Sequence, residues 1–357
     1  MQKINDSPEL LEHLMCPAFM VKDGIILHTN QSALDRQIQL NTPVGDLISI
    51  GKEEYAQFTH GRLCLTLCIC DVSCQASITQ ADGFHLFCLE SSYENPEFRA
   101  YALAAQHLRE ALSSAMSSAE ILLPSPALQE DPEMHQQAAQ LNRSLHQLLR
   151  TVCNMSDAAL YHSFQSCNMQ TRDAAAFFEE ILEKTSALAE QAKRTLLCKC
   201  PSQSIHCLID EEKLERALLN LISNAIKYTP EGGTIEASLR SSGSRLYFTI
   251  QGSGDGLPSK ESHDVFSRFL REPGIEDGRN GIGLGMSIVR SVAAIHGGTV
   301  LMEQPADAGL RFTMTIVNRP PDSTQLHSIS QLLIDYAGGW DHALLELSDA
   351  LPDSVYQ

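Results

Sequence analysis

One stretch of the chain, residues 210–317, constrains the fold more than any other. It opens with DEEKLERALLNLISNAIKY, whose apolar residues recur at helical spacing and form one face, namely Leu214, Leu218, Leu221 and Ile222. Asn220, Asn224 and Lys227 recur on another side at spacings of four and three residues. Amide oxygens are hard ligands that suit hydrated Mg²⁺, and an ammonium group attracts phosphate. The stripe therefore predicts either a metal–phosphate site or a solvated helix face.

Two glycine-rich loops follow this helix. QGSGDGLP comes after a predicted strand and contains Gly254 and Gly256, where the lack of a side chain lets the backbone approach a ligand closely. NGIGLGMSIV places three glycines directly before an apolar helix, at Gly281, Gly283 and Gly285. Free backbone N–H groups at such a helix start bind anions. The Asn helix and two glycine loops within one α/β unit favour the metal–phosphate interpretation.

This ordered set resembles the ATP-binding domain of sensor histidine kinases, a branch of the Bergerat-fold ATPases that includes gyrase-type and Hsp90-type enzymes. NLISNAIKYTPEGG is similar to the family's Asn box and GSGDGLP to its first glycine box. VFSRFLR is similar to its Phe box and GIGLGMSIV to its second glycine box. The resemblance covers residues 98–318 and implies an α/β sandwich that binds ATP with Mg²⁺.

The resemblance also implies a role for individual residues. Asn220 and Asn224 hold Mg²⁺ with its phosphates, Asn224 being the metal ligand, and Lys227 lies near the phosphates. The loop 269–280 forms the lid over ATP. The remaining nucleotide-binding positions are glycines of the two boxes, namely Gly254, Gly256, Gly281, Gly283 and Gly285.

Asn220 separates two branches of this family. The ATP-hydrolysing relatives have a Glu at this place, four residues before the Mg²⁺-binding Asn, and its carboxylate activates water. An amide cannot accept a proton near neutral pH, so water is a poor nucleophile at Asn220. The sequence therefore favours a kinase over an ATP-hydrolysing enzyme of the gyrase or Hsp90 type. A Bergerat-fold kinase that phosphorylates a partner's serine stays as an alternative.

The first glycine box departs from the family pattern. The family has an Asp two residues before the first Gly of G-x-G, and its carboxylate accepts the adenine amino group. Aligned on Gly254 and Gly256, that position is Gly252, and Asp255 is an uncertain substitute. Loss of a hydrogen bond to a charged group costs about 1.5–3 kcal/mol. The sequence therefore predicts weak or relaxed nucleotide binding.

The region before this domain contains two heptad-like stripes joined by the Pro-rich break PSPALQEDPE. The first stripe consists of Tyr101, Ala105, Leu108, Leu112, Ala115, Ala119 and Leu122. The second consists of Met134, Ala138, Leu141, Leu145, Leu148, Val152 and Met155. They predict an antiparallel helical hairpin over residues 93–165 that buries its seam in a homodimeric four-helix bundle. The alternative is a hairpin that packs within its own chain.

The phosphoacceptor motif of the resembled family is altered. It reads His, acid, Leu, Arg, and then Pro-Leu after one residue, whereas this chain reads AAQHLREAL. Matching Leu108 and Arg109 to the motif puts Gln106 at the acceptor position and His107 at the acid position. In a shifted register His107 is the acceptor, with Glu110 three residues on as its carboxylate. An exposed surface histidine is the alternative interpretation of His107.

The first segment, residues 1–92, resembles a PAS sensor domain. AFMVKDGIILHTN predicts a strand pair with a turn at Asp23-Gly24, and three further strands are predicted in GRLCLTLCIC, CQASITQ and GFHLFCLESS. Cys64, Cys68 and Cys70 share one strand face, which cannot close a tetrahedral metal site. We interpret these thiols, and those of Cys198 and Cys200, as buried and reduced.

Composition excludes some partners. With 26 Lys and Arg against 44 Asp and Glu, the net charge of −18 repels phosphate backbones and anionic lipid, so we expect neither nucleic acid nor membrane as a partner. The longest apolar stretch, residues 63–72, is interrupted by polar residues and is too short to span a bilayer. The N-terminus lacks the apolar core of a signal peptide, so we expect a cytoplasmic protein.

These observations predict an α+β multidomain protein: a PAS-like α/β domain at 1–92, a hairpin at 93–165, a Bergerat-fold domain at 166–318 and a tail at 319–357. The resemblance implies a sensor histidine kinase that phosphorylates a histidine and then the receiver domain of a response regulator. The altered Gln106 and Gly252 positions leave open a catalytically degenerate scaffold that signals by binding proteins. The tail, which contains the only Trp, suggests no chemistry.

Overall fold

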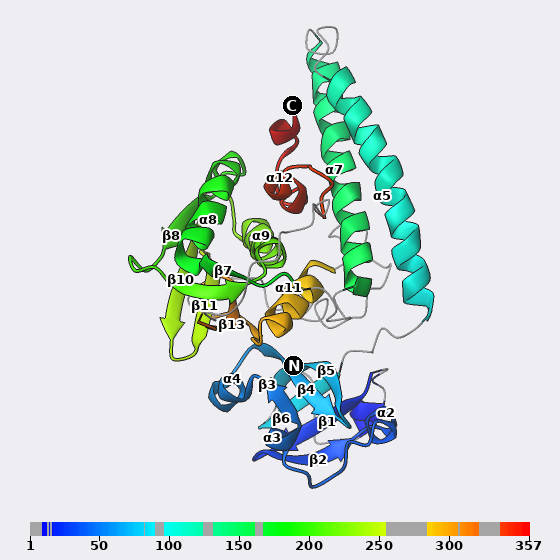
Figure 1. The fold of residues 1–357 in the computed structure, drawn as a ribbon, viewed down its shortest axis with the longest axis vertical. Coiled ribbons are helices and arrows are strands. Elements are labelled where there is room, and N and C mark those ends of the chain that lie inside the picture. The colour runs from blue at the N-terminus through cyan, green and yellow to red at the C-terminus, as the bar shows by residue number, and fades with distance from the viewer. Residues whose placement is uncertain are drawn as a thin grey trace.

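The structure is a computed structural model that describes residues 9–12, 14, 16–81, 83–89, 96–123, 131–160, 167–254, 284–305, 308–320 and 336–357. Within these ranges the chain is a mixed α/β protein (Figure 1) with an 11-stranded sheet and a separate two-stranded sheet. No helix in these ranges has the length and apolarity that a membrane crossing needs.

The N-terminal unit is a sheet flanked by short helices. Its strands are β1 (Ala18–Lys22), β2 (Ile25–Thr29), β3 (Ile48–Ile50), β4 (Arg62–Ile69), β5 (Val72–Ala81) and β6 (Phe84–Leu89). Its helices are α1 (Glu9–Glu12), α2 (Gln31–Asp35), α3 (Val44–Leu47) and α4 (Lys52–Gln57). The predicted pairing of β1 with β2 is confirmed, and Asp23 and Gly24 both have positive φ at its turn. The stacked rings of Phe19 and Phe87 lie 4.8 Å apart in the core of this unit.

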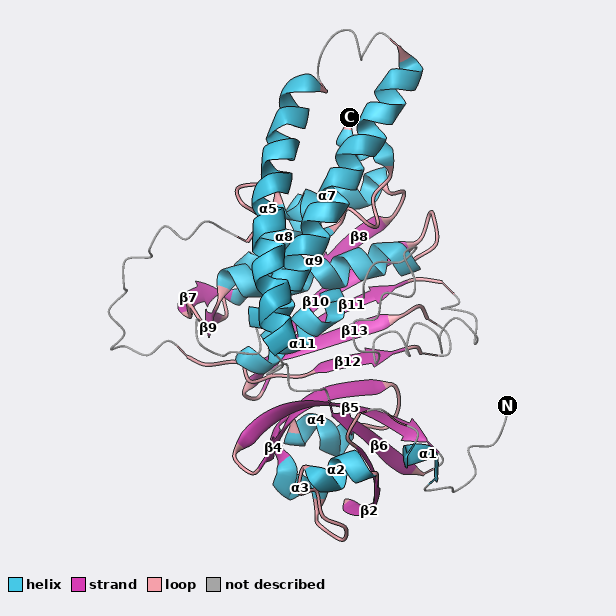
Figure 2. Ribbon diagram, turned by 90° about the vertical axis from the view of Figure 1, so that its right-hand side faces the viewer, coloured by secondary structure: helices cyan, strands magenta, loops and turns pink. Residues whose placement is uncertain are grey.

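Two long helices, α5 (Pro96–Leu122) and α7 (Pro132–Leu160), follow and run side by side (Figures 1 and 2). Part of the predicted apolar seam is buried, including Ala105 and Val152. Other members of both stripes are about half exposed or more, namely Leu108, Leu122, Met134, Leu141 and Leu148. The helix pair therefore presents apolar side chains that the described part of the chain leaves exposed.

The C-terminal α/β unit places three helices on one face of its part of the sheet (Figure 2). Its strands are β7 (Gln170–Asp173), β8 (Thr195–Lys199), β9 (His206–Ile209), β10 (Thr234–Ser242), β11 (Arg245–Gly252), β12 (Val300–Glu303) and β13 (Arg311–Val317). Its helices are α8 (Ala174–Gln191), α9 (Glu211–Tyr228) and α11 (Leu284–Ile295). Their apolar faces and the inward side chains of the strands share one core, in which Phe178 meets Phe248 edge to face.

The sheet continues from one unit into the other, because β4 pairs antiparallel with β12. The strand order is β2-β1-β6-β5-β4-β12-β13-β11-β10-β8 (Figure 2). Gly61 precedes β4 with a φ of 88°, and a Cβ there would lie 2.4 Å from the Met302 carbonyl oxygen. Arg245 on β11 also pairs with Glu54 on α4 at 3.1 Å. The junction is therefore a continuous hydrogen-bonded ladder, which the sequence did not predict.

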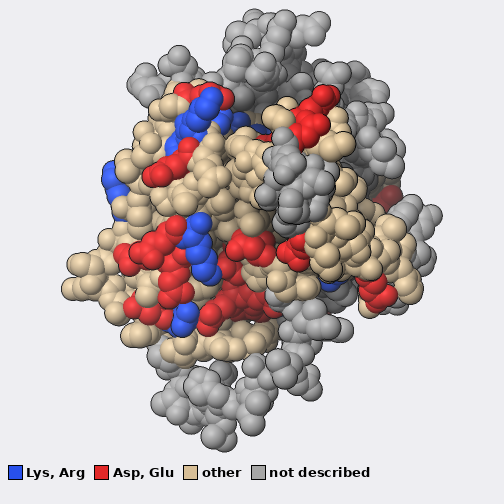
Figure 3. Space-filling view, turned by 90° about the horizontal axis from the view of Figure 1, so that it is seen from above, with Lys and Arg blue, Asp and Glu red and all other residues tan. Residues whose placement is uncertain are grey.

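The C-terminal segment, residues 336–357, contains α12 (His342–Glu346) and a 3₁₀-helix, η1 (Asp353–Tyr356). Asp341 caps α12 by accepting a hydrogen bond from the Leu344 N–H at 2.8 Å. The segment lies between α7 on one side and α8 and α9 on the other (Figure 1). The surface seen from above carries grouped acidic side chains with fewer basic ones between them (Figure 3), in keeping with the negative net charge.

Candidate functional site

Helix α9 carries the residues of the predicted metal–phosphate stripe. It begins after Asp210, whose Oδ1 accepts a hydrogen bond from the Lys213 N–H at 3.2 Å. The Asp210 N–H in turn donates to Nε2 of His296 on the loop after α11, at 3.0 Å. Burial lowers the pKa of His296, which keeps its ring neutral and able to accept this bond. The cap and the buried histidine therefore fix the start of α9 against the end of α11.

Asn224 and Lys227 lie in the last turns of α9 and are both half-buried. The Lys227 ammonium nitrogen lies 5.9 Å from the centroid of the Tyr228 ring. The helix ends at Thr229, where the chain meets the end of β11. An accessible amide and an ammonium group at this corner have the chemistry to meet a metal-bound phosphate.

Gly252 at the end of β11 lies against Thr229. A Cβ at Gly252 would lie 2.3 Å from the Thr229 Oγ1, so any side chain there requires this buried threonine to move. Gly252, which we aligned with an Asp of the resembled family, therefore has a neighbour that occupies the space of any side chain at this position. Gly254, two residues on, has a φ of 116°, a conformation that glycine adopts readily.

Asn220 is placed differently from Asn224, because its side chain is fully buried in a polar network. Its Nδ2 donates to the Arg216 carbonyl oxygen and to Glu346 Oε2, each at 2.9 Å. Its Oδ1 accepts a hydrogen bond from Arg150 Nη2 on α7 at 3.1 Å. Gly285 on α11 abuts the same amide, since a Cβ there would lie 2.4 Å from Asn220 Oδ1. In this arrangement the amide is engaged by protein groups on three elements.

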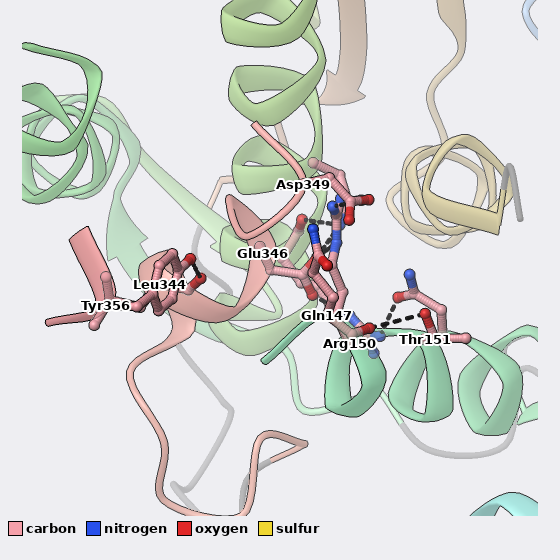
Figure 4. A network of polar contacts seen from close by, with 10 residues as sticks. Gln147, Arg150, Thr151, Leu344, Glu346, Asp349 and Tyr356 are labelled. Atoms are coloured by element: carbon pink, nitrogen blue, oxygen red, sulfur yellow. Dashed lines mark hydrogen bonds and ion pairs between the residues drawn. The ribbon is translucent and has the colours of Figure 1, made fainter. Parts of the chain in front are cut away.

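Glu346 of α12 is the centre of this network and is fully buried. Its carboxylate pairs with Arg150 Nε at 3.1 Å (Figure 4) and with Arg216 Nε at 3.0 Å. Arg216 is itself fully buried and donates from Nη2 to Asn154 Oδ1 on α7 at 2.8 Å. Because this carboxylate has no solvent exposure, it is unsuited to activate a water molecule. The network joins α7, α9 and α12.

Sequence reasoning missed this network, although two signals were present. Glu346 stands among the leucines of HALLELS, and Arg216 occupies the buried side of α9 one turn before Asn220. Charged residues of opposite sign within apolar helical faces indicate mutual burial. The sequence did not indicate which of these charged residues pair with one another, because Arg150 and Glu346 are 196 positions apart in the chain.

The predicted acceptor region lies on α5. Gln106, His107 and Glu110 are all exposed, and Leu108 is 54% exposed. Arg109 is half-buried. The structure thus leaves the His107 imidazole open to an approaching group.

Several predicted site residues lie outside the described residues. These are Gly256, Gly281 and Gly283, the lid 269–280 and the Phe box at 265–271. The described part of the candidate site consists of Asn224 and Lys227 in the last turns of α9, and of Gly252 and Gly254, which lie against Thr229 and Pro230 directly after that helix.

The interpretation of Cys198 and Cys200 as buried thiols is wrong. Cys198 on β8 is exposed and Cys200 is half-exposed, because β8 is the last strand in the order of the sheet. Their sulfurs lie 3.3 Å apart, and the Glu179 carboxylate lies within 4.8 Å of both. In the N-terminal unit Cys70 is likewise exposed, whereas Cys64 and Cys68 are half-buried.

Comparison with known proteins identifies the C-terminal unit. Residues 209–320 match the family described as histidine kinase-, DNA gyrase B-, and HSP90-like ATPase. Histidine kinase P4 of Formosa agariphila is 29% identical over 182 residues, which cover 49% of this chain and 13% of that protein. The sensor histidine kinase TmoS of Ectopseudomonas mendocina is 28% identical over 64% of this chain and 24% of its own length.

Further relatives agree with this assignment. The adaptive-response sensory kinase SasA of a Synechococcus strain is 30% identical over 41% of each chain. This chain therefore spans between 13% and 41% of the length of these three relatives. Among solved structures, full-length ShkA in complex with AMPPNP has a TM-score of 0.49 at 23% identity, covering 61% of this chain and 45% of ShkA. Residues 209–320 of this chain therefore form a histidine-kinase-type ATP-binding domain.

Proposed function

We propose that the protein is a sensor histidine kinase that transfers the γ-phosphoryl group of ATP to His107 and then to the receiver domain of a response regulator. The observation that carries this proposal is the corner formed by Asn224, Lys227 and the Gly252–Gly254 turn within a histidine-kinase-type ATP-binding domain. His107 is exposed on α5, which packs against α7, and α7 in turn contacts α11 of this domain. We propose the domain limits expected from the sequence: the N-terminal domain at 1–92, the helical hairpin at 93–165, the ATP-binding domain at 166–318 and the tail at 319–357.

Each residue has a proposed task in this reaction. The half-buried Asn224 amide has the hard oxygen that Mg²⁺ prefers, and Lys227 adds positive charge beside the phosphates. Mg²⁺, when bound, neutralises phosphate charge during transfer. The His107 imidazole is the nucleophile, and Glu110 lies one helical turn later, where it can orient that ring. Catalysis on this chain therefore consists of positioning and charge neutralisation.

We propose a homodimer formed through α5 and α7. Leu108 and Leu122 on α5, and Met134, Leu141 and Leu148 on α7, are exposed apolar side chains at heptad spacing on two neighbouring helices. A second copy of the helix pair buries such side chains in a four-helix bundle. The proposed location of this dimer is the cytoplasm.

A second function has a specific observation in its favour. Gly252 lacks the adenine-binding carboxylate, Thr229 fills the space beside it, and Asn220 is engaged by Glu346 and Arg150. A chain that keeps the fold but binds nucleotide weakly acts as a scaffold that presents its helix pair to a receiver domain. This alternative predicts protein binding without phosphoryl transfer.

Phosphoryl transfer from γ-labelled ATP distinguishes these functions. The kinase proposal predicts acid-labile label on the protein that is lost in His107→Gln and in Asn224→Ala. The matched control for the first variant is His135→Gln on α7, and that for the second is Asn168→Ala, an exposed residue before β7. Acid-stable label indicates a serine kinase instead. Absence of label in the native chain at millimolar ATP contradicts the kinase proposal and supports the scaffold.

A further inference from the structure

The C-terminal segment, residues 336–357, contacts α9 of the ATP-binding domain through several different interactions. The Tyr336 N–H donates to Glu212 Oε1 at 3.1 Å. The Arg216 guanidinium lies over the Tyr336 ring, 4.3 Å from its centroid. His342 meets Glu215 at 2.7 Å. These contacts run along α9 from its first turn toward its middle.

The same segment also contacts α7 through several polar side chains. Arg143 pairs with Asp353 at 2.9 Å, and Arg150 pairs with Asp349 at 2.8 Å (Figure 4). Gln147 Nε2 donates to the Ser348 carbonyl oxygen at 3.2 Å. The segment is therefore bound to both the helix pair and the ATP-binding domain.

A small apolar core adds to these polar contacts. It combines side chains of α5 and α7 with the first part of the segment, namely Met116, Leu149, Cys153, Tyr336, Ala337 and Leu345. The His146 ring of α7 lies 5.9 Å from Trp340 and 4.9 Å from Tyr356 between ring centroids. The only tryptophan of the chain is thus used to attach the segment to α7.

The contact with Asn220 has a consequence for the nucleotide site. Asn220 lies one helical turn before Asn224, so both side chains project from the same side of α9. Glu346 from the segment accepts one N–H of this amide, and Arg150, itself bound to Glu346, occupies its oxygen. Asn220 is fully buried as a result, whereas Asn224 stays half-buried.

We propose that residues 336–357 are an autoinhibitory segment that fixes the ATP-binding domain to α7 and withholds Asn220 from the nucleotide site. This inference rests on the proposed kinase function. Phosphoryl transfer requires the bound nucleotide to reach His107 on α5, and this movement changes the separation of α7 and α9. The segment opposes the movement because its carboxylates bridge the two helices. Release of the segment frees both the domain and the Asn220 amide.

Two variants test the segment with different risks to folding. The first ends the chain before Tyr336 and removes the whole segment. The second, Asp349→Asn with Asp353→Asn, removes the two half-exposed ion pairs to α7 and leaves the buried Glu346 in place, so Arg150 keeps a partner. The matched control is Glu180→Gln with Glu236→Gln, which removes two exposed ion pairs within the ATP-binding domain.

The measurements are the initial rate of label transfer from γ-labelled ATP and the calorimetric affinity for a non-hydrolysable ATP analogue. We expect the double Asp variant to label itself roughly two- to tenfold faster than the native chain, as two partly exposed ion pairs allow. The truncated chain should label faster still, and the control should match the native rate. Equal or slower labelling by both variants, with nucleotide affinity retained, overturns the autoinhibitory role. Absence of nucleotide binding in all chains overturns the proposed function, and this inference with it.

Discussion

Replacing Glu346 with Gln removes one negative charge from the most buried polar network of the described structure without changing the size of the side chain. The carboxylate now accepts hydrogen bonds from Arg150, Arg216 and the Asn220 amide at 2.9 to 3.1 Å. After the change Arg216, which has no solvent exposure, loses the carboxylate charge that faces its guanidinium group at 3.0 Å and retains its hydrogen bond to Asn154. Removal of one partner from a buried ion pair costs about 3–5 kcal/mol.

This loss translates into a large fall in melting temperature. One kcal/mol shifts Tm by about 2–4 °C in a protein of this size class, so Glu346→Gln should lower Tm by roughly 6–20 °C. The assay is calorimetric unfolding of the native chain, of Glu346→Gln and of Asp349→Asn. The Asp349 carboxylate is 32% exposed, so its replacement should cost only about 0–1 kcal/mol. Equal small shifts for both variants would refute the reasoning, because they would mean that Glu346 is not buried against Arg216.

Three further predictions concern other elements. Gly61→Ala places a Cβ against the Met302 carbonyl at a positive φ, so it should weaken the junction of β4 with β12 and expose it to limited proteolysis; an unchanged digestion pattern would contradict this. Gly252→Asp should lower Tm through its clash with Thr229, and adding Thr229→Gly should recover part of the loss; a second variant that only adds destabilisation would argue against the clash. Burial lowers the pKa of His296, so the unfolded ring binds a proton below about pH 6.5 while the folded ring does not. The unfolding free energy should therefore fall as the pH drops below about 6.5, and a pH slope unchanged in His296→Gln would count against this origin.

The sequence carried the local structure and the family of the ATP-binding domain. Asp23-Gly24 marked the turn between β1 and β2, and heptad spacing indicated the positions of α5 and α7. The Asn-bearing helix and its glycine-rich neighbours identified the family that the comparisons confirm for residues 209–320. These features depend on residues close together in the chain, where period and turn chemistry are decisive.

Contacts between distant residues were beyond sequence reasoning. Glu346 and Arg216 are 130 positions apart, and nothing in the tail's short helical pattern indicated which helix it would meet. The pairing of β4 with β12 joins two edge strands, and strand pairing of this kind has no local signal. Asn220 illustrates this for the candidate site. Its spacing predicted that it shares a helix face with Asn224, but the sequence did not predict its neighbours Arg150 and Glu346, which come from other elements.

Gly252 illustrates a gap of a different kind. From the resemblance we predicted that position 252 lacks the family's carboxylate, whereas the structure adds that Thr229 lies where a side chain at this position would begin. The substitution and its neighbour form one packed unit at the end of β11. Restoring an acid there therefore requires a change at both positions.

The nucleotide site is tested most directly by calorimetric titration of the full chain with Mg²⁺ and a non-hydrolysable ATP analogue. We expect saturable binding that is lost in Asn224→Ala and kept in Asn168→Ala. Absence of binding at millimolar nucleotide, or equal affinity in the native chain and in Asn224→Ala, would contradict the assignment of the nucleotide site to the last turns of α9.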